Sequence, residues 1–134
     1  MTLSNPILNA TLNHISLAEI KKEKGPPNWS HQVVLAEHVV GVVIYQNPGT
    51  ENDRHCHSYD EWWIVAEGEI DWIIEGREDN PVHAKAGDFV FVPALTFHKI
   101  YPKGDTPSVR IGVALPGHGH LHEKPEAKAR ITIA

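Results

Sequence analysis

The sequence predicts an all-β fold with short helical or irregular segments at its two ends. Its apolar stretches are short, about four to eight residues, and rich in β-branched side chains, which favours strands over buried helices. Turns containing glycine or proline separate them at a spacing typical of a sandwich or a barrel. The stretches expected to form strands are Gln32–Ala36, Val39–Gln46, Trp62–Ala66, Ile70–Glu75, Phe89–Pro93, Phe97–Tyr101 and Val109–Leu115.

The helical candidates are confined to the ends of the chain. Ser16–Lys24 and Glu123–Arg130 are the two segments, and in the first of them Leu17 and Ile20 repeat the helical spacing only briefly. Nothing in the chain looks like an internal repeat or a linker. A length of 134 residues fits one domain, since domains typically contain roughly 100–150 residues, so we expect a single domain over residues 1–134.

Charge and apolar patterning exclude two classes of partner. The chain has 12 Lys and Arg against 17 Asp and Glu, a net charge of −5, and therefore lacks the basic surface that nucleic acids or anionic bilayers attract. Its longest apolar run, Val39–Tyr45, is far shorter than the roughly 20 residues that span a membrane. The single cysteine, Cys56, and a start without a basic or apolar leader predict a cytoplasmic protein.

Histidine is the unusual residue, with ten copies gathered mainly in two groups, His55-Cys56-His57 and His118-Gly119-His120-Leu121-His122. In the first group the full spacing is Gly49-x5-His55-x-His57-x3-Glu61-x6-Gly68. Side chains two positions apart in a strand share a face, so His55 and His57 point together and Cys56 points away. A bend after His57 returns Glu61 to the same side, and two imidazoles with a carboxylate suit a divalent metal.

A second stretch supplies a fourth ligand. It reads Gly87-x5-Pro93-x4-His98, with His98 opening a new strand after a turn. Three histidines and one glutamate from two hairpins would leave one or two coordination positions open, which is the usual requirement of a catalytic metal. The predicted ligands are His55, His57, Glu61 and His98.

These spacings resemble the two motifs of the cupin superfamily, G(x)5HxH(x)3–4E(x)6G and G(x)5PxG(x)2H(x)3N. Every defined position of the first motif is present at 49–68, and the second, at 87–102, is matched at Gly87, Pro93 and His98. It departs at Leu95 and Pro102, positions that shape a turn. The resemblance implies a double-stranded β-helix, or jelly-roll, barrel of the small single-domain (cupin 2) type, with one divalent transition metal (Fe, Mn, Ni or Zn) in its mouth, and often a homodimer.

The function implied by this resemblance is an enzyme acting on a small organic acid or its analogue. Dioxygenase, decarboxylase, isomerase and lyase chemistry all stay open at this point, and no catalytic residue beyond the metal ligands is assigned. The alternative is a barrel that binds or senses a small molecule without turnover. In either case the expected partner is a small molecule and not a nucleic acid or a membrane.

Strand parity predicts the wall of the pocket. Trp63 and Val65 share the parity of Glu61, and Ile100 shares that of His98, so all three are expected to face the metal. Tyr59 lies beside the ligands, either as a partner of the site or as an ordinary turn residue. Trp62 takes the opposite face, where we expect it to pack against the other layer, a terminal segment or a second subunit.

The other histidines and the cysteine are given structural roles. Cys56 is expected to be a buried packing residue. The segment containing His118, His120 and His122 is expected to be a solvated loop after Pro116, with a weak metal trap or a flap over the mouth as the alternative. The histidines without ligand-like spacing are expected at the surface or at strand ends: His14, His31, His38 and His83.

Overall fold

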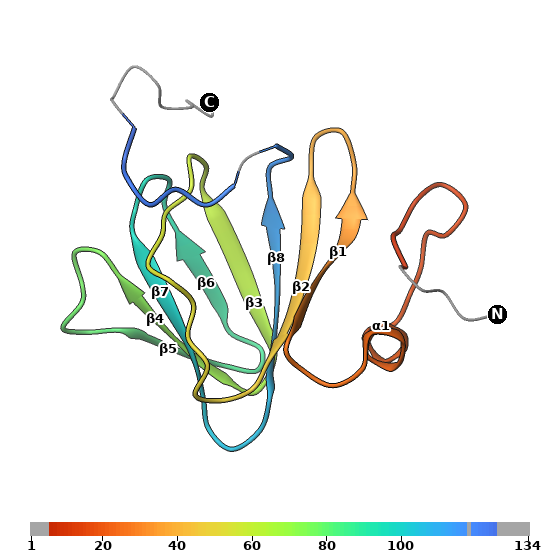
Figure 1. Cartoon of the computed structure of the whole chain (residues 1–134), viewed down its shortest axis with the longest axis horizontal. Coiled ribbons are helices and arrows are strands. Elements are labelled where there is room, and N and C mark those ends of the chain that lie inside the picture. The colour runs from red at the N-terminus through yellow and green to blue at the C-terminus, as the bar shows by residue number, and fades with distance from the viewer. Residues whose placement is uncertain (1–5, 118, 126–134) are drawn as a thin grey trace.

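Two antiparallel sheets pack against each other in the computed structural model (Figure 1), which describes residues 6–117 and 119–125. The larger sheet has the strand order β1-β2-β8-β3-β6 and the smaller one β5-β4-β7. The all-β class predicted from the sequence is confirmed. The strands are β1 (Trp29–Leu35), β2 (Val40–Gln46), β3 (Glu61–Glu67), β4 (Glu69–Ile74), β5 (Val82–Lys85), β6 (Phe89–Val92), β7 (His98–Lys103) and β8 (Ser108–Ala114).

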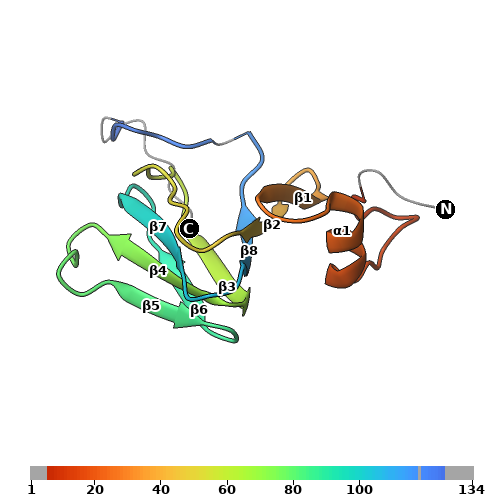
Figure 2. The same ribbon diagram turned by 60° about the horizontal axis from the view of Figure 1, so that its bottom comes forward.

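One helix, α1 (Leu17–Lys24), covers the outer face of the larger sheet (Figure 2). It begins where the Ser16 hydroxyl accepts a hydrogen bond of 3.0 Å from the backbone N–H of Glu19, and Ile20 packs into the sheet. The predicted N-terminal helix is thereby confirmed. Of the predicted helix at Glu123–Arg130, only residues 123–125 are described and they are not helical; the others lie outside the described residues.

Within the described residues, no helix combines the length and the apolar character that a membrane span requires.

The main core lies between the two sheets, and β3 contributes alternate side chains to it. Glu61, Trp63 and Val65 are buried, whereas Trp62 is 43% exposed, so the two-residue period expected for this strand is found. Of the three partners expected for Trp62, the other layer is wrong, and no terminal segment within the described residues buries the side chain. Its ring lies at the surface of the larger sheet, with its centroid 6.2 Å from that of Phe89.

Two local features differ from the sequence prediction. Strand β5 was not expected, because it has only four residues and alternates polar His83 and Lys85 with just one fully buried side chain, Ala84. His31, expected at the surface, is only 5% exposed. Its Nε2 donates a hydrogen bond of 2.8 Å to the carbonyl oxygen of Pro6, which satisfies the buried ring.

Candidate metal centre

Backbone pairing joins the two histidine-bearing segments. The N–H of His55 donates to the carbonyl of His98 (3.1 Å), and the N–H of His98 donates back to that of His55 (2.8 Å). The N–H of Leu95 donates to the carbonyl of His57 over 2.7 Å. The chain between β2 and β3 is thereby held against the start of β7, and the histidines of both segments come to one place.

Leu95 adopts the backbone conformation that the resembled motif reserves for glycine. Its φ angle is 57°, and among the described residues it is the one non-glycine residue with a positive φ. For a side chain with a Cβ this conformation costs roughly 1–2 kcal/mol. The Leu95 side chain is 8% exposed, so its burial offsets part of that cost. The turn that positions His98 is therefore kept although the glycine is not.

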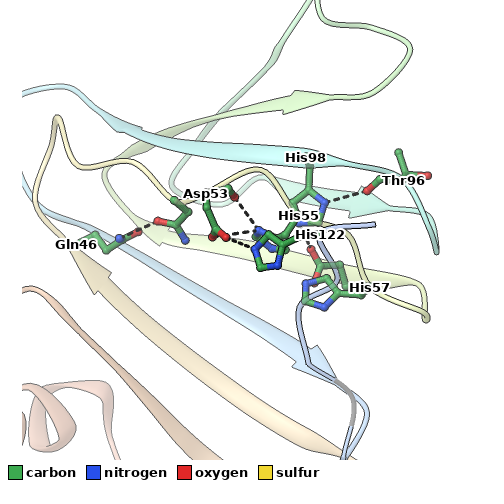
Figure 3. A network of polar contacts seen from close by, with 9 residues as sticks. Gln46, Asp53, His55, His57, Thr96, His98 and His122 are labelled. Atoms are coloured by element: carbon green, nitrogen blue, oxygen red, sulfur yellow. Dashed lines mark hydrogen bonds and ion pairs between the residues drawn. The ribbon is translucent and has the colours of Figure 1, made fainter. Parts of the chain in front are cut away.

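The three histidines form a buried cluster (Figure 3), and Glu61 contacts it. His55, His57 and His98 are 2%, 6% and 1% exposed, and one ring nitrogen from each lies within 4.8 Å of the others. Glu61 contacts two of the rings, with Oε2 3.1 Å from Nε2 of His57 and Oε1 3.0 Å from Nε2 of His98. The four predicted ligands are thus gathered, and the three-histidine cluster could hold a metal ion.

Hydrogen bonds to backbone carbonyls orient two of the rings. Nδ1 of His55 donates to the carbonyl of Asp53 (2.8 Å), and Nδ1 of His98 donates to that of Thr96 (3.1 Å) (Figure 3). In a neutral imidazole this leaves the Nε2 lone pair free to bind a metal. Nε2 of His98 and Oε1 of Glu61 both lack a hydrogen-bond partner. Two acceptors 3.0 Å apart repel each other unless a proton or a metal cation lies between them, so the cluster fits a metal ion.

Burial also prepares the charge state that a metal needs. It lowers the pKa of His55 to about 4 and holds the pKa of His57 below its usual value, although nearby Glu61 opposes the second shift. Burial alone would raise the pKa of Glu61, but His98 and His57 outweigh it and hold that pKa low. A neutral His55 ring and an ionised Glu61 carboxylate are the protonation states in which these side chains bind a metal.

The lowered pKa of His55 predicts a pH-dependent stability for the metal-free protein. Below the unfolded pKa of about 6.5, the unfolded chain binds a proton that the folded chain does not, so the free energy of unfolding falls as the pH drops from about 6.5 to about 4. One pKa unit corresponds to about 1.4 kcal/mol, which limits the loss from this residue to about 3 kcal/mol. Urea titrations after chelator treatment measure it. His55→Gln should flatten the curve in this window, and an unchanged slope would contradict the assignment.

A cavity of about 570 Å³ opens beside the cluster and includes His55, His57 and Glu61 in its wall. Of the residues predicted to line it, Tyr59, Trp63 and Ile100 do so. Val65 does not: its side chain is fully buried in the core between the sheets, so the expectation for this residue is corrected. Burial raises the pKa of Tyr59 to about 12, and its phenol is therefore a hydrogen-bond donor at neutral pH.

His120 and His122 of the C-terminal segment lie beside the histidine cluster. The backbones of Leu121 and Cys56 exchange hydrogen bonds of 2.8 and 2.9 Å, which lays residues 119–122 across the mouth. His120 stacks on His55 with ring centroids 4.0 Å apart and lines the cavity, and His122 contacts the Asp53 carboxylate. The segment is exposed as expected, but its position matches the flap alternative. His118 lies outside the described residues.

Cys56 has the packing role expected of it. It is fully buried, and it belongs to neither of the two groups of potential ligands found among the described residues. Burial raises the pKa of its thiol. A protonated thiol is a poor metal ligand and a poor nucleophile.

Sequence reasoning missed Arg110, which lies in the middle of β8 and lines the same cavity. Its Nη1 donates a hydrogen bond of 2.6 Å to Oε1 of Gln46, whose Nε2 donates in turn to Oδ1 of Asn52 over 3.0 Å. The available signal was a single charged residue within the apolar run Val109–Leu115. Arg110 lies two positions from Gly112 and so shares its face of β8. A Cβ at Gly112 would lie 2.5 Å from the Trp63 ring, so this face is directed into the barrel.

Solved structures share this fold at low sequence identity. A cupin-2 domain protein from Shewanella frigidimarina has a TM-score of 0.61 and 17% identity, over 75% of this chain and 94% of its own. An RmlC-like cupin with a double-stranded β-helix fold from Methanocaldococcus jannaschii has a TM-score of 0.61 and 23% identity, over 69% and 83%. The DMSP lyase DddQ from Ruegeria pomeroyi has 0.54 and 23%, over 61% of this chain but only 40% of its own.

Sequence comparison gives the family directly. No curated protein sequence matches the chain. The profile of the Cupin_2 family, described as a cupin domain, matches residues 42–114, which run from β2 to the end of β8 and include both histidine-bearing segments. Because this match spans more than half of the chain and the two-sheet fold agrees with it, the protein belongs to the Cupin_2 family of cupin domains.

Proposed function

We propose that the chain is a metal-dependent enzyme with a mononuclear site in which His55, His57, His98 and Glu61 hold one divalent transition metal. The observation that carries the proposal is the buried cluster of these side chains beside a cavity of about 570 Å³. A structural metal would be closed off by its ligands, whereas a catalytic metal keeps a position open to a pocket.

The chain's own residues would orient and shield the reaction. A metal at this site would supply Lewis-acid polarisation of a substrate oxygen. The carbonyls of Asp53 and Thr96 hold two of the imidazoles in place through their Nδ1 atoms. Trp63 and Ile100 give the cavity an apolar wall that limits water, and the protonated Tyr59 phenol is part of the same wall.

Substrate and reaction class are proposed only broadly, as dioxygenation, decarboxylation, isomerisation or lyase chemistry on a small organic acid or its analogue. One matched cupin structure is a DMSP lyase, but at 23% identity that likeness extends to the fold and not to its substrate. Iron, manganese, nickel and zinc all accept imidazole ligands. Intrinsic affinity favours the later metals, so the ion found also reflects which metal is available.

Turnover separates the enzyme from the alternative, a binding or sensing cupin. Chelator-treated protein is reloaded with Fe(II) in air, or anaerobically with Mn(II), Ni(II) or Zn(II), and supplied with small diols, thiols, β-dicarbonyls and hydroxy acids. Oxygen uptake or a new product that requires the metal supports the enzyme. Saturable binding without product across the panel favours the sensor.

The tail histidines are expected to leave the metal site intact when removed. Replacing His118, His120 and His122 together by alanine should retain one tight metal per chain, because the inner donors come from other segments. The second potential cluster, Asp53 with His55 and His120, shares a histidine whose Nδ1 is already hydrogen-bonded. Elemental analysis after dialysis measures the content. Loss of the tight metal would mean that the tail supplies a ligand.

We also propose a homodimer in the cytoplasm. Trp62, Phe89 and Phe91 are 43%, 70% and 57% exposed on neighbouring strands of one sheet face. Large apolar side chains grouped on a surface favour association. Sedimentation velocity over a range of concentrations tests this, and a monomer throughout would contradict it.

A further inference from the structure

Arg110 is a buried cation in the wall of the cavity. It lies at the centre of the larger sheet, paired with Ile44 on β2 and with Val65 on β3. Its side chain is only 1% exposed, and yet it lines the same cavity as His57 and Glu61. Burial lowers its pKa to about 10, so the guanidinium is still charged at neutral pH.

The protein satisfies only part of this charge. Nη1 donates to Gln46, but the buried Nε has no hydrogen-bond partner. The guanidinium lies over the face of Trp63, 5.3 Å from the ring centre. None of the ion pairs between described residues includes Arg110. The charge of Glu61 attracts the guanidinium and opposes the lowering of its pKa, but the two side chains do not form an ion pair. A buried charge without a directly bonded anion destabilises a fold, so its presence in a cavity wall indicates a partner that arrives from outside.

No other group in the wall fills that role. Among the described residues that line the cavity, Glu61 is the only carboxylate, and its two oxygens face the rings of His57 and His98. With neutral imidazoles, a divalent metal, Glu61 and Arg110 would give the cavity a net positive charge. The complement of a guanidinium fork is a planar anion that accepts two hydrogen bonds, which a carboxylate provides.

We propose that Arg110 binds the carboxylate of a small organic acid, which fixes the ligand in the cavity with its other end toward the histidine cluster. Gln46 and Asn52 act as positioning residues, because their chain of hydrogen bonds fixes the plane of the guanidinium. This inference deepens the proposed function and relies on it only for the metal at the other end of the ligand.

The test compares acids with their uncharged amides. Acetate, pyruvate, malonate and succinate are each titrated against the corresponding amide, with metal-free and metal-loaded protein, by calorimetry or ligand-observed NMR. At least one acid should bind about tenfold or more tightly than its amide, as expected for charge-assisted hydrogen bonds. Arg110→Met should abolish this preference and leave the metal content unchanged. Equal binding of acid and amide across the panel by the wild-type protein would overturn the proposal.

The two proposals fail in different ways. If the protein holds no metal, but metal-free protein prefers the acid and Arg110→Met does not, the metalloenzyme is wrong and the anion site stands. If metal binds and Arg110→Met keeps the wild-type preference, the anion site is wrong and the metal site stands.

Stability separates a ligand-binding role from a structural one. Because the charge of Arg110 is buried without an ion pair among the described residues, Arg110→Met should melt at or above the wild-type temperature without ligand, and should lose the rise that the acid gives the wild type. A variant that keeps the acid-dependent rise would overturn the proposal, whatever its melting temperature without ligand. If this variant does not fold, Arg110→Lys carries the test, because it keeps the charge without the fork. The proposal is supported if Arg110→Lys binds the acid more weakly than the wild-type protein binds it, but more tightly than the wild-type protein binds the amide. It is overturned if Arg110→Lys binds the acid as tightly as the wild-type protein does.

Discussion

Replacing His57 by alanine is expected to remove the tightly bound metal, from one ion per chain to background after dialysis. The variant loses the Nε2 that lies 3.1 Å from Glu61 and opens one side of a buried four-residue set. Loss of a hydrogen-bond partner behind a ligand typically weakens metal binding about 10–100-fold, so loss of the ligand itself should exceed the upper end of that range. Elemental analysis and competition with a chelator of known affinity measure the change.

A matched control is another histidine that lies away from the site. His83 is on β5, is exposed, and contacts Asp71 and Glu69 at the edge of the smaller sheet. His83→Ala should keep the full metal content. If His57→Ala also keeps one tight ion, the cluster described above is not the metal site, whatever else the protein binds.

Much of this site could be predicted because its information is local in the sequence. The two-residue period of extended chain places His55 and His57 on one side and Cys56 on the other. Glu61 and His98 each belong to a short segment whose residue spacing matches a motif, at 49–68 and at 87–102. Helix α1 was predicted for the same reason, since the helical spacing of Leu17 and Ile20 lies within one turn of the chain.

The remaining features depend on contacts between distant segments. Arg110 faces the cavity because β8 pairs with both β2 and β3, and no spacing within β8 says what lies opposite it. Similarly, His120 reaches the mouth only because Leu121 pairs with Cys56, 65 positions earlier in the sequence. His31 is buried because the N-terminal segment returns over it. Each of these is a tertiary effect that local patterning does not contain.

Trp63→Ala is expected to lower the free energy of unfolding by about 3 kcal/mol, near the lower end of the range for buried aromatic truncations. The ring is 9% exposed, belongs to the core between the sheets, and fills the space above Gly112, where a Cβ would lie 2.5 Å away. One side of it borders the cavity, so water can fill part of the space left behind. The same substitution removes the ring beneath the Arg110 guanidinium and should weaken ligand binding too.

Trp62→Ala, one residue earlier, is expected to change the stability of the monomer by less than about 1 kcal/mol. Its side chain is 43% exposed and lies beside Phe89, which is also exposed. If the proposed dimer uses this face, the substitution should instead weaken the dimer and make the melting temperature less dependent on protein concentration than that of the wild type. Urea titrations of both variants at two protein concentrations, with metal content checked, give the comparison.

A Trp62→Ala variant that loses more monomer stability than Trp63→Ala would mean that β3 is shifted by one residue, because a one-residue slip exchanges the two faces of a strand. Glu61 would then point away from the histidines, and the candidate metal centre would lose its carboxylate.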